Sequence, residues 1–279
     1  MKGIKVNFIK GIKMINWTLY KHGIKSNYKI SILFFGLLTM YITSIVSMYN
    51  PEALSVMAEF AKTMPEIMAM VGMTGDSATM MGYLITYLYG FIFLVIPFIV
   101  TLIVSNNLMV AHVDRGSMAY LLSSYNSRKT IIFTQMKVLG TFIFALMAYC
   151  TILTIISCEL MFPGDLDINK LLIINTGLFA LHMFLGGISF LSSTVTNEIN
   201  HSTIFGAGIP LVFFLIQMLA NMGGKLEYLG NFTIFSLFQP QKLLNGEVNS
   251  YLLVVIMFIL AIILYISAFY IFKRKDMSI

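Results

Sequence analysis

The sequence predicts an all-α protein of a single domain that crosses a membrane six times. Composition is the first reason: 58% of the 279 residues are hydrophobic and 11% are charged, whereas a soluble domain has roughly 45–50% and 25%. The second reason is six long runs with almost no charge, since a helix needs about 20 apolar residues to cross the hydrocarbon layer. Together these observations exclude a soluble globular protein.

The six runs divide the chain into an arm of residues 1–29, a transmembrane bundle of residues 30–272 and a tail of residues 273–279. The first run follows a lysine-rich arm, as in a signal peptide. It is longer than the apolar core of such a peptide and lacks a cleavage signal, so we expect it to be retained. The runs cover residues 30–49, 83–111, 131–158, 171–195, 203–222 and 251–272.

Lysine and arginine are distributed unequally between the two faces that six spans create. Fourteen of them lie in the arm, the loop between the second and third runs, and the tail. The other face has four, namely Lys62, Lys170, Lys225 and Lys242. Because positive residues accumulate on the cytoplasmic side, we expect both termini in the cytoplasm. We expect the membrane to be the plasma membrane of a bacterium. The net charge of +6 then reflects topology and not a nucleic-acid partner.

Three segments outside the runs carry patterns of their own. In the arm, apolar residues fall within an arc of about 80° on a helical wheel, which predicts an amphipathic helix lying on anionic lipid or on a partner. These residues are Ile4, Phe8, Ile12, Ile15 and Leu19. The loop 50–82 predicts two short helices, the second beginning at Pro65. The loop 223–250 predicts aromatic anchors at the membrane interface: Tyr228, Phe232, Phe235 and Phe238.

Ionisable groups at membrane depth would mark an intramembrane enzyme or a proton-coupled carrier, because they are costly there. The candidates are His182, Lys137 and Glu159, of which the last two can reach the interfaces. We interpret His182 as a hydrogen-bond donor between packed helices. Cys150 and Cys158 are interpreted as packing or lipid-facing residues, since their spacing fits neither a metal site nor a disulfide framework.

The chain has no GxxxxGK[ST] phosphate loop and no HExxH motif, so we expect no catalytic site, no metal site and no bound cofactor. Energy, if it is used, is therefore expected to come from another subunit. Pro97 and Pro210 lie inside the second and fifth runs, where each removes a backbone donor and kinks the helix. Gly186 and Gly187 predict a close approach between helices.

The loop between the second and third runs, residues 112–130, is the most informative segment. Asp114 is placed to cap a short helix, and Ser127 and Arg128 return the chain to the membrane. The apolar residues of this short helix share one face, and they are Met118, Leu121 and Leu122.

The loop resembles the signature loop of ABC type-2 transporter permeases, in which an acidic residue, Gly-Thr, Leu-Leu and Ser-Arg precede a long span. The residues that carry the match are Asp114, Gly116, Ser117, Leu121, Leu122, Ser127 and Arg128. Tyr125 departs from the pattern, since the family usually has proline there. The tail, Phe272 followed by Lys-Arg-Lys-Asp, is similar to the family's aromatic-basic-acidic ending. Pro65, Glu66 and Gly72 resemble its beta-exotoxin-type branch.

This resemblance implies a permease subunit of an ATP-driven exporter that forms the substrate pathway as a dimer, with a second copy or a paralogous permease. Separate ATP-binding subunits would carry ATP and magnesium, with the short helix seated in a cleft of the ATPase. The residues assigned to this contact are Asp114, Arg115, Gly116, Ser117, Met118, Leu121, Leu122, Ser127 and Arg128. The loop 196–202, with Glu198, is either a second contact or a solvated turn.

Two other functions stay open from the sequence. A stand-alone channel or secondary carrier would show internal repeats and broken polar helices at mid-membrane, and we find neither pattern. An immunity or sensory membrane subunit, which binds without transporting, cannot be separated from an exporter by sequence. The substrate is not readable either, because Met-rich and aromatic helix faces suit lipid-like cargo, peptide cargo and lipid contact equally.

Overall fold

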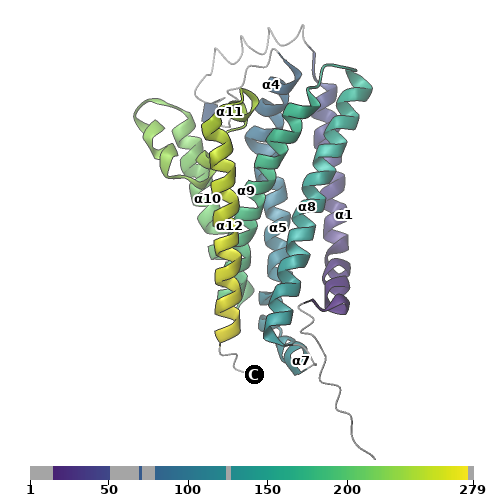
Figure 1. Ribbon diagram of the computed structural model, residues 1–279, viewed down its shortest axis with the longest axis vertical. Coiled ribbons are helices and arrows are strands. Elements are labelled where there is room, and N and C mark those ends of the chain that lie inside the picture. Colours follow the sequence, from purple (N-terminus) through teal and green to yellow (C-terminus); the bar gives the residue numbers. More distant parts are fainter. Residues whose placement is uncertain (1–14, 51–68, 71–78, 124–126, 276–279) are drawn as a thin grey trace, which may run out of the picture.

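The computed structural model describes residues 15–50, 69–70, 79–123 and 127–275. Every regular element in these ranges is a helix (Figure 1). Six crossings are long and apolar enough to span a membrane. The predicted all-α, multi-pass membrane fold is therefore confirmed. The six crossings are α1 Trp17–Ser47, a composite second crossing Met80–Asp114, α8 Arg128–Met161, α9 Ile168–Val195, α10 Ile199–Asn221 and α12 Val248–Arg274.

The second crossing is not one regular helix. A π-helix lies near its start, and a short break at Met109 separates the last turn from the rest. The loop that follows it contains a further short helix, α7 Met118–Ser123. The parts of the crossing are α4 Met80–Leu84, the π-helix η1 Ile85–Ile92, α5 Phe93–Leu108 and α6 Val110–Asp114.

Polar caps set where the long helices begin. The side chains of Asn16, Ser127 and Asp167 each accept a hydrogen bond from a backbone N–H in the first turn of α1, α8 and α9, which satisfies a donor that the helix cannot pair. The helices consequently start outside their apolar runs. In α1 the helix begins at Trp17, so the described part of the predicted arm is continuous with the first span.

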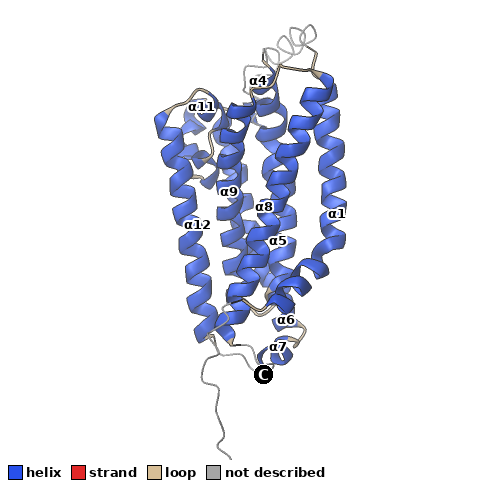
Figure 2. Ribbon diagram, turned by 45° about the vertical axis from the view of Figure 1, so that its right-hand side comes forward, coloured by secondary structure: helices blue, strands red, loops and turns tan. Residues whose placement is uncertain are grey.

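Helix α9 occupies the centre of the bundle, between α12 and α10 on one side and α5 and α8 on the other (Figures 1 and 2). In its most apolar window 67% of the residues are buried, against 17% in α1 and in α10. Glycine permits this packing: a Cβ at Gly186 would lie 2.7 Å from Ile143 Cδ1, and one at Gly187 would lie 3.1 Å from Leu264 Cβ. The predicted close approach of helices is confirmed here.

The loop between α10 and α12 is built from three short helices, and its aromatic residues divide into two groups. Tyr228 and Phe232 are exposed, as interfacial anchors would be, whereas Phe235 and Phe238 are buried in the core. The prediction of four outward anchors is therefore wrong for two of them. The short helices are η2 Gly224–Phe232, η3 Ile234–Leu237 and α11 Pro240–Leu244.

Several predictions fall outside the described residues. They are the arm's apolar stripe at Ile4, Phe8 and Ile12, the two short helices around Pro65, and the branch motif with Glu66 and Gly72.

Candidate functional site

The predicted short helix exists. Helices α6 and α7 form a compact corner at the end of the bundle where the described chain also ends (Figures 1 and 2). Gly116 takes a left-handed conformation with φ of +68°, which only glycine adopts at little cost. The Ser117 hydroxyl lies 3.0 Å from His112 Nδ1, and this contact closes the corner.

The helix cap differs from the prediction. Asp114 is the last residue of α6, whereas the backbone carbonyl of Ser117 accepts the first helical bond of α7, from the Leu121 N–H. The assignment of Asp114 as the cap of α7 is therefore wrong. The left-handed turn at Gly116 separates Asp114 from α7, so its carboxylate belongs to the corner and not to the helix start.

The apolar face of α7 also exists, but it is turned toward the chain itself. Met118 is buried, and Leu121 and Leu122 are half-buried against the hydrophobic core. The side chain that points outward is Tyr120, which is 80% exposed. Asp114 and Arg115, on the same corner, are exposed as well.

A set of hydrogen bonds ties the start of α8 to Lys275, directly after α12, and to the end of α9. Arg128 Nη1 donates to the Lys275 carbonyl at 2.6 Å, and Lys275 Nζ donates to the carbonyls of Thr194 and Thr196 at 2.9 and 2.7 Å. We call these four residues the tail clasp. The lysine satisfies carbonyls that the C-terminus of α9 leaves free, and partial burial lowers the pKa of Lys275 from its ordinary value.

The second predicted contact, Glu198, lies at the same end of the bundle. It directly precedes α10, and α6 contacts the α10 helix. Its side chain is exposed and lies 3.2 Å from His201 Nδ1. The structure therefore places this residue on the same end as α7, as a solvated side chain beside the start of α10.

A buried polar network joins this end of α5 to α9 and α10, and sequence analysis missed it. Asn106 accepts a hydrogen bond from the Ser202 hydroxyl at 2.7 Å and donates one to Thr203 at 3.0 Å. Ser105 and Ser193 lie 3.2 Å apart. The available signal was the run of three polar residues Ser105-Asn106-Asn107 inside an otherwise apolar segment, since such residues bond between helices in membranes.

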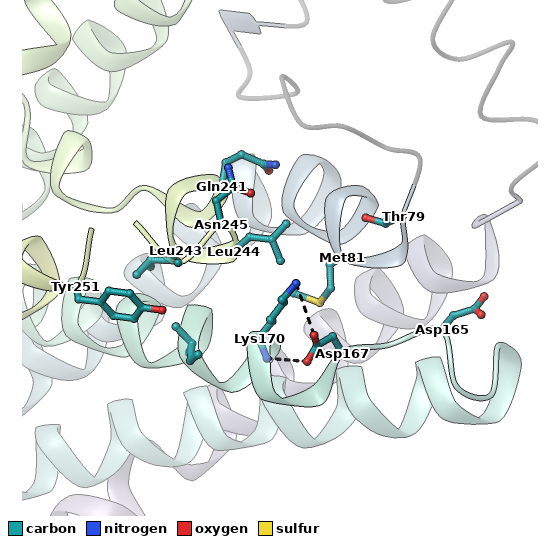
Figure 3. Close-up of a pocket in the computed structure, with 12 residues that line it drawn as sticks. Thr79, Met81, Asp165, Asp167, Lys170, Gln241, Leu243, Leu244, Asn245 and Tyr251 are labelled. Carbon is teal, nitrogen blue, oxygen red and sulfur yellow. Dashed lines mark hydrogen bonds and ion pairs between the residues drawn. The ribbon is translucent and has the colours of Figure 1, made fainter. Parts of the chain in front are cut away.

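The opposite end of the bundle holds a pocket of about 650 Å³, shown in Figure 3. Two of its residues, Asp167 and Lys170, form an ion pair at 3.8 Å, and both side chains are about half exposed. Within the described ranges no group of three His, Cys, Asp or Glu could hold a metal ion. The polar residues that line the pocket are Thr79, Asp165, Asp167, Lys170, Gln241, Asn245 and Tyr251.

The remaining candidates behave as packing or interfacial residues. Cys150 and Cys158 are free and buried, which confirms the packing interpretation. His182 is fully buried, and its Nε2 lies 2.7 Å from the Phe93 carbonyl, which confirms it as a hydrogen-bond donor between helices. Lys137 is exposed near the ring of Phe133.

No protein-family model, no curated protein and no solved structure matches this chain.

Proposed function

We propose that this chain is the membrane subunit of an ATP-driven exporter of the ABC type-2 permease kind, coupled to a separate ATP-binding subunit through the corner formed by α6 and α7. The observation that carries the proposal is the fixed seat of α7. Its apolar face is held on the core and Tyr120 faces outward. A force applied to such a corner is transmitted to the helices on both sides of it.

The connections of the corner support the same function. The second crossing leads into it, and Arg128 at the start of α8 is tied to Lys275 and to α9 through the tail clasp. Displacement of α7 would therefore move several spans together. This end of the bundle faces the cytoplasm in our proposal, because of the lysine and arginine bias. The membrane is the plasma membrane of a bacterium.

The lipid-exposed faces of α1, α10 and α12, the least buried of the six crossings, leave room for a second permease copy in a dimer. A proton-coupled carrier is less well supported, because His182 is bonded to a backbone carbonyl and no second ionisable side chain joins it in a relay among the described residues.

The test uses a photo-crosslinking amino acid at position 120 in the full chain, expressed in its own host. We expect it to capture a protein that carries a P-loop ATPase domain, and the purified complex to hydrolyse ATP. The chain purified alone in detergent should show no nucleotide turnover. The matched control carries the crosslinker at Leu252, which is exposed on α12 and should contact lipid. Crosslinking at position 120 to lipid alone, or ATP turnover by the isolated chain, would contradict the proposal.

A further inference from the structure

The second crossing contains two features that weaken a regular α-helix within a short distance. Residues Ile85–Ile92 form a π-helix, and Pro97 follows inside α5. π-helical turns are rare and occur frequently at functional sites, and both π-helical turns and proline are recognised causes of helix kinks. This crossing leads directly to α6 and α7.

A side chain from α9 replaces the hydrogen bond that Pro97 removes. Proline has no N–H, so the carbonyl four residues earlier, that of Phe93, loses its helical donor. His182 Nε2 lies 2.7 Å from that carbonyl oxygen, and the histidine is fully buried. Because a carbonyl can only accept, Nε2 carries the proton.

A second side chain of α9 holds the π-helix. The Tyr89 hydroxyl lies 2.6 Å from Asn175 Oδ1, and both residues are buried. Asn175 and His182 are seven residues apart, so they lie on one face of α9. This face of α9 therefore makes two hydrogen bonds to the second crossing, one to Tyr89 in the π-helix and one to the Phe93 carbonyl that proline leaves free.

The Asn175 and His182 side chains each have a second polar atom that makes no hydrogen bond among the described residues. Asn175 Nδ2 and His182 Nδ1 are buried and have no hydrogen-bond partner among the described residues. Buried polar atoms without partners are uncommon in native proteins. Each side chain thus has capacity to exchange partners when the second crossing moves.

We infer that residues 85–97 form a hinge in the second crossing and that His182 is its latch, a positioning residue that holds the freed Phe93 carbonyl in one of two arrangements. When the latch opens, the part of the crossing that leads to α7 can change direction relative to the part that begins at Met80. The use of this motion in coupling rests on the proposed function, whereas the latch itself does not.

The test of the latch is a double-mutant cycle between positions 182 and 97, read as the melting temperature (Tm) of the chain alone in detergent. His182→Leu leaves a buried carbonyl without a donor, and we expect Tm to fall by on the order of 5 °C. Pro97→Ala restores the backbone donor, so the same histidine change should then lower Tm by less than about 2 °C. His182→Gln, which keeps an N–H donor, should recover most of the loss. An equal loss in both backgrounds would overturn the latch.

A matched control exists on the same face of α9. Ser189 lies seven residues after His182, and its hydroxyl approaches the Gly206 carbonyl, which Pro210 frees in α10. The distance is 3.5 Å, at the limit of a hydrogen bond. A cycle of Ser189→Ala with Pro210→Ala should show coupling no greater than its error. Coupling there as large as at His182 would show a general proline effect and overturn the assignment of a specific latch.

Hydrogen exchange of the chain alone in nanodiscs tests the hinge without any ATPase. His182→Leu should accelerate amide exchange at least tenfold in residues 85–97 and leave α10 unchanged, whereas exchange that rises throughout the bundle would contradict a local hinge.

In the complex with its ATP-binding subunit, Pro97→Ala should reduce coupled transport severalfold while raising Tm. Transport at the unaltered level in that stabilised variant would contradict a hinge that works in coupling. The Tm cycle and the exchange experiment use the chain alone, so they test the His182 latch even if no ATPase complex exists. A failure of the proposed function is therefore distinguished from a failure of the latch.

Discussion

The two ends of the bundle are held together in different ways. At the end that carries α7, long-range hydrogen bonds join elements far apart in the sequence, such as Arg128 to Lys275 and Asn106 to Ser202. At the opposite end the described hydrogen bonds are mostly local, within η2, η3 and the helix caps. A bond from the Tyr83 hydroxyl to the Ile45 carbonyl, at 2.9 Å, also joins two crossings there. A pocket of about 650 Å³ lies there between the starts of α4 and α9 and the helix α11.

This difference separates a cross-linked end from an adaptable one. Side chains that bond across several helices make those helices move as one body, whereas local caps fix only the helix they belong to. For a protein driven from one side, the cross-linked end is the one suited to receive a force. The opposite end, with short helices and open space, is suited to change shape in response.

The largest expected effect is all-or-none labelling of the two ends. Cysteine at Asn245, at the pocket end, should react on intact cells with an impermeant maleimide, and cysteine at Ser123, in α7, should not, because of the lysine and arginine bias. Both positions are exposed, and the native cysteines are buried. Permeabilised cells should label both variants. The reverse pattern on intact cells would mean that the pocket end faces the cytoplasm and that the proposed site at α6 and α7 lies outside the cell.

The next effect is the loss of the α7 seat. Because Leu121 and Leu122 are half-buried on the core, changing both to alanine should cost about 2–3 kcal/mol of local stability in total. We expect faster hydrogen exchange in residues 118–123 and weaker binding of the ATP-binding subunit, with membrane insertion intact. The matched change of Leu252 and Leu253 on α12 should leave both measurements near the unaltered values. Unchanged partner binding in the α7 variant would mean that the corner is an ordinary loop.

A smaller loss is expected for the tail clasp. Lys275→Met removes two charge-assisted bonds to the end of α9, and we expect a loss of about 1 kcal/mol, since the side chain is only partly buried. Arg128→Met should cost a similar amount, and the double variant should lose less than the sum because the two residues share one network. Urea unfolding in detergent measures each loss. Lys273→Met, on an exposed residue of the same tail, is the control, and an equal loss there would contradict the clasp.

The smallest effect is predicted at the pocket end. The Asp167–Lys170 pair is about half exposed at 3.8 Å, and such surface pairs contribute roughly 0–1 kcal/mol. Lys170→Met should therefore change Tm by less than about 2 °C, and added salt should reduce the difference further. A loss larger than that of Lys275→Met would reverse the comparison between the two ends.

Helix periodicity predicted the short helix α7 but not its surroundings. Spacing placed Met118, Leu121 and Leu122 on one face, and the structure has that face buried on its own core. Periodicity identifies an apolar stripe without identifying what covers it. The cap was misassigned for a related reason: Asp114 and Ser117 are both acceptable capping residues, and the turn at Gly116 decides between them.

The tail clasp and the latch lay beyond prediction because their partners are distant in the chain. Lys275 and Thr194 meet only when α12 packs on α9. Pro97 predicted a freed carbonyl, and His182 was a plausible donor, yet nothing local in the sequence joins the two. Their pairing depends on the relative height of α5 and α9 in the bundle.

The sequence by itself determined the number of crossings, the all-α class and the existence of a short helix between the second and third spans. These follow from local quantities, namely the length of apolar runs and the period of a helix, which do not depend on the neighbours. The tertiary structure alone decided that α9 is central, which side of α7 is free, and which side chain meets the carbonyl that Pro97 frees. Those are contacts between distant segments, and side-chain packing and hydrogen-bond geometry select among many arrangements that the same apolar pattern allows.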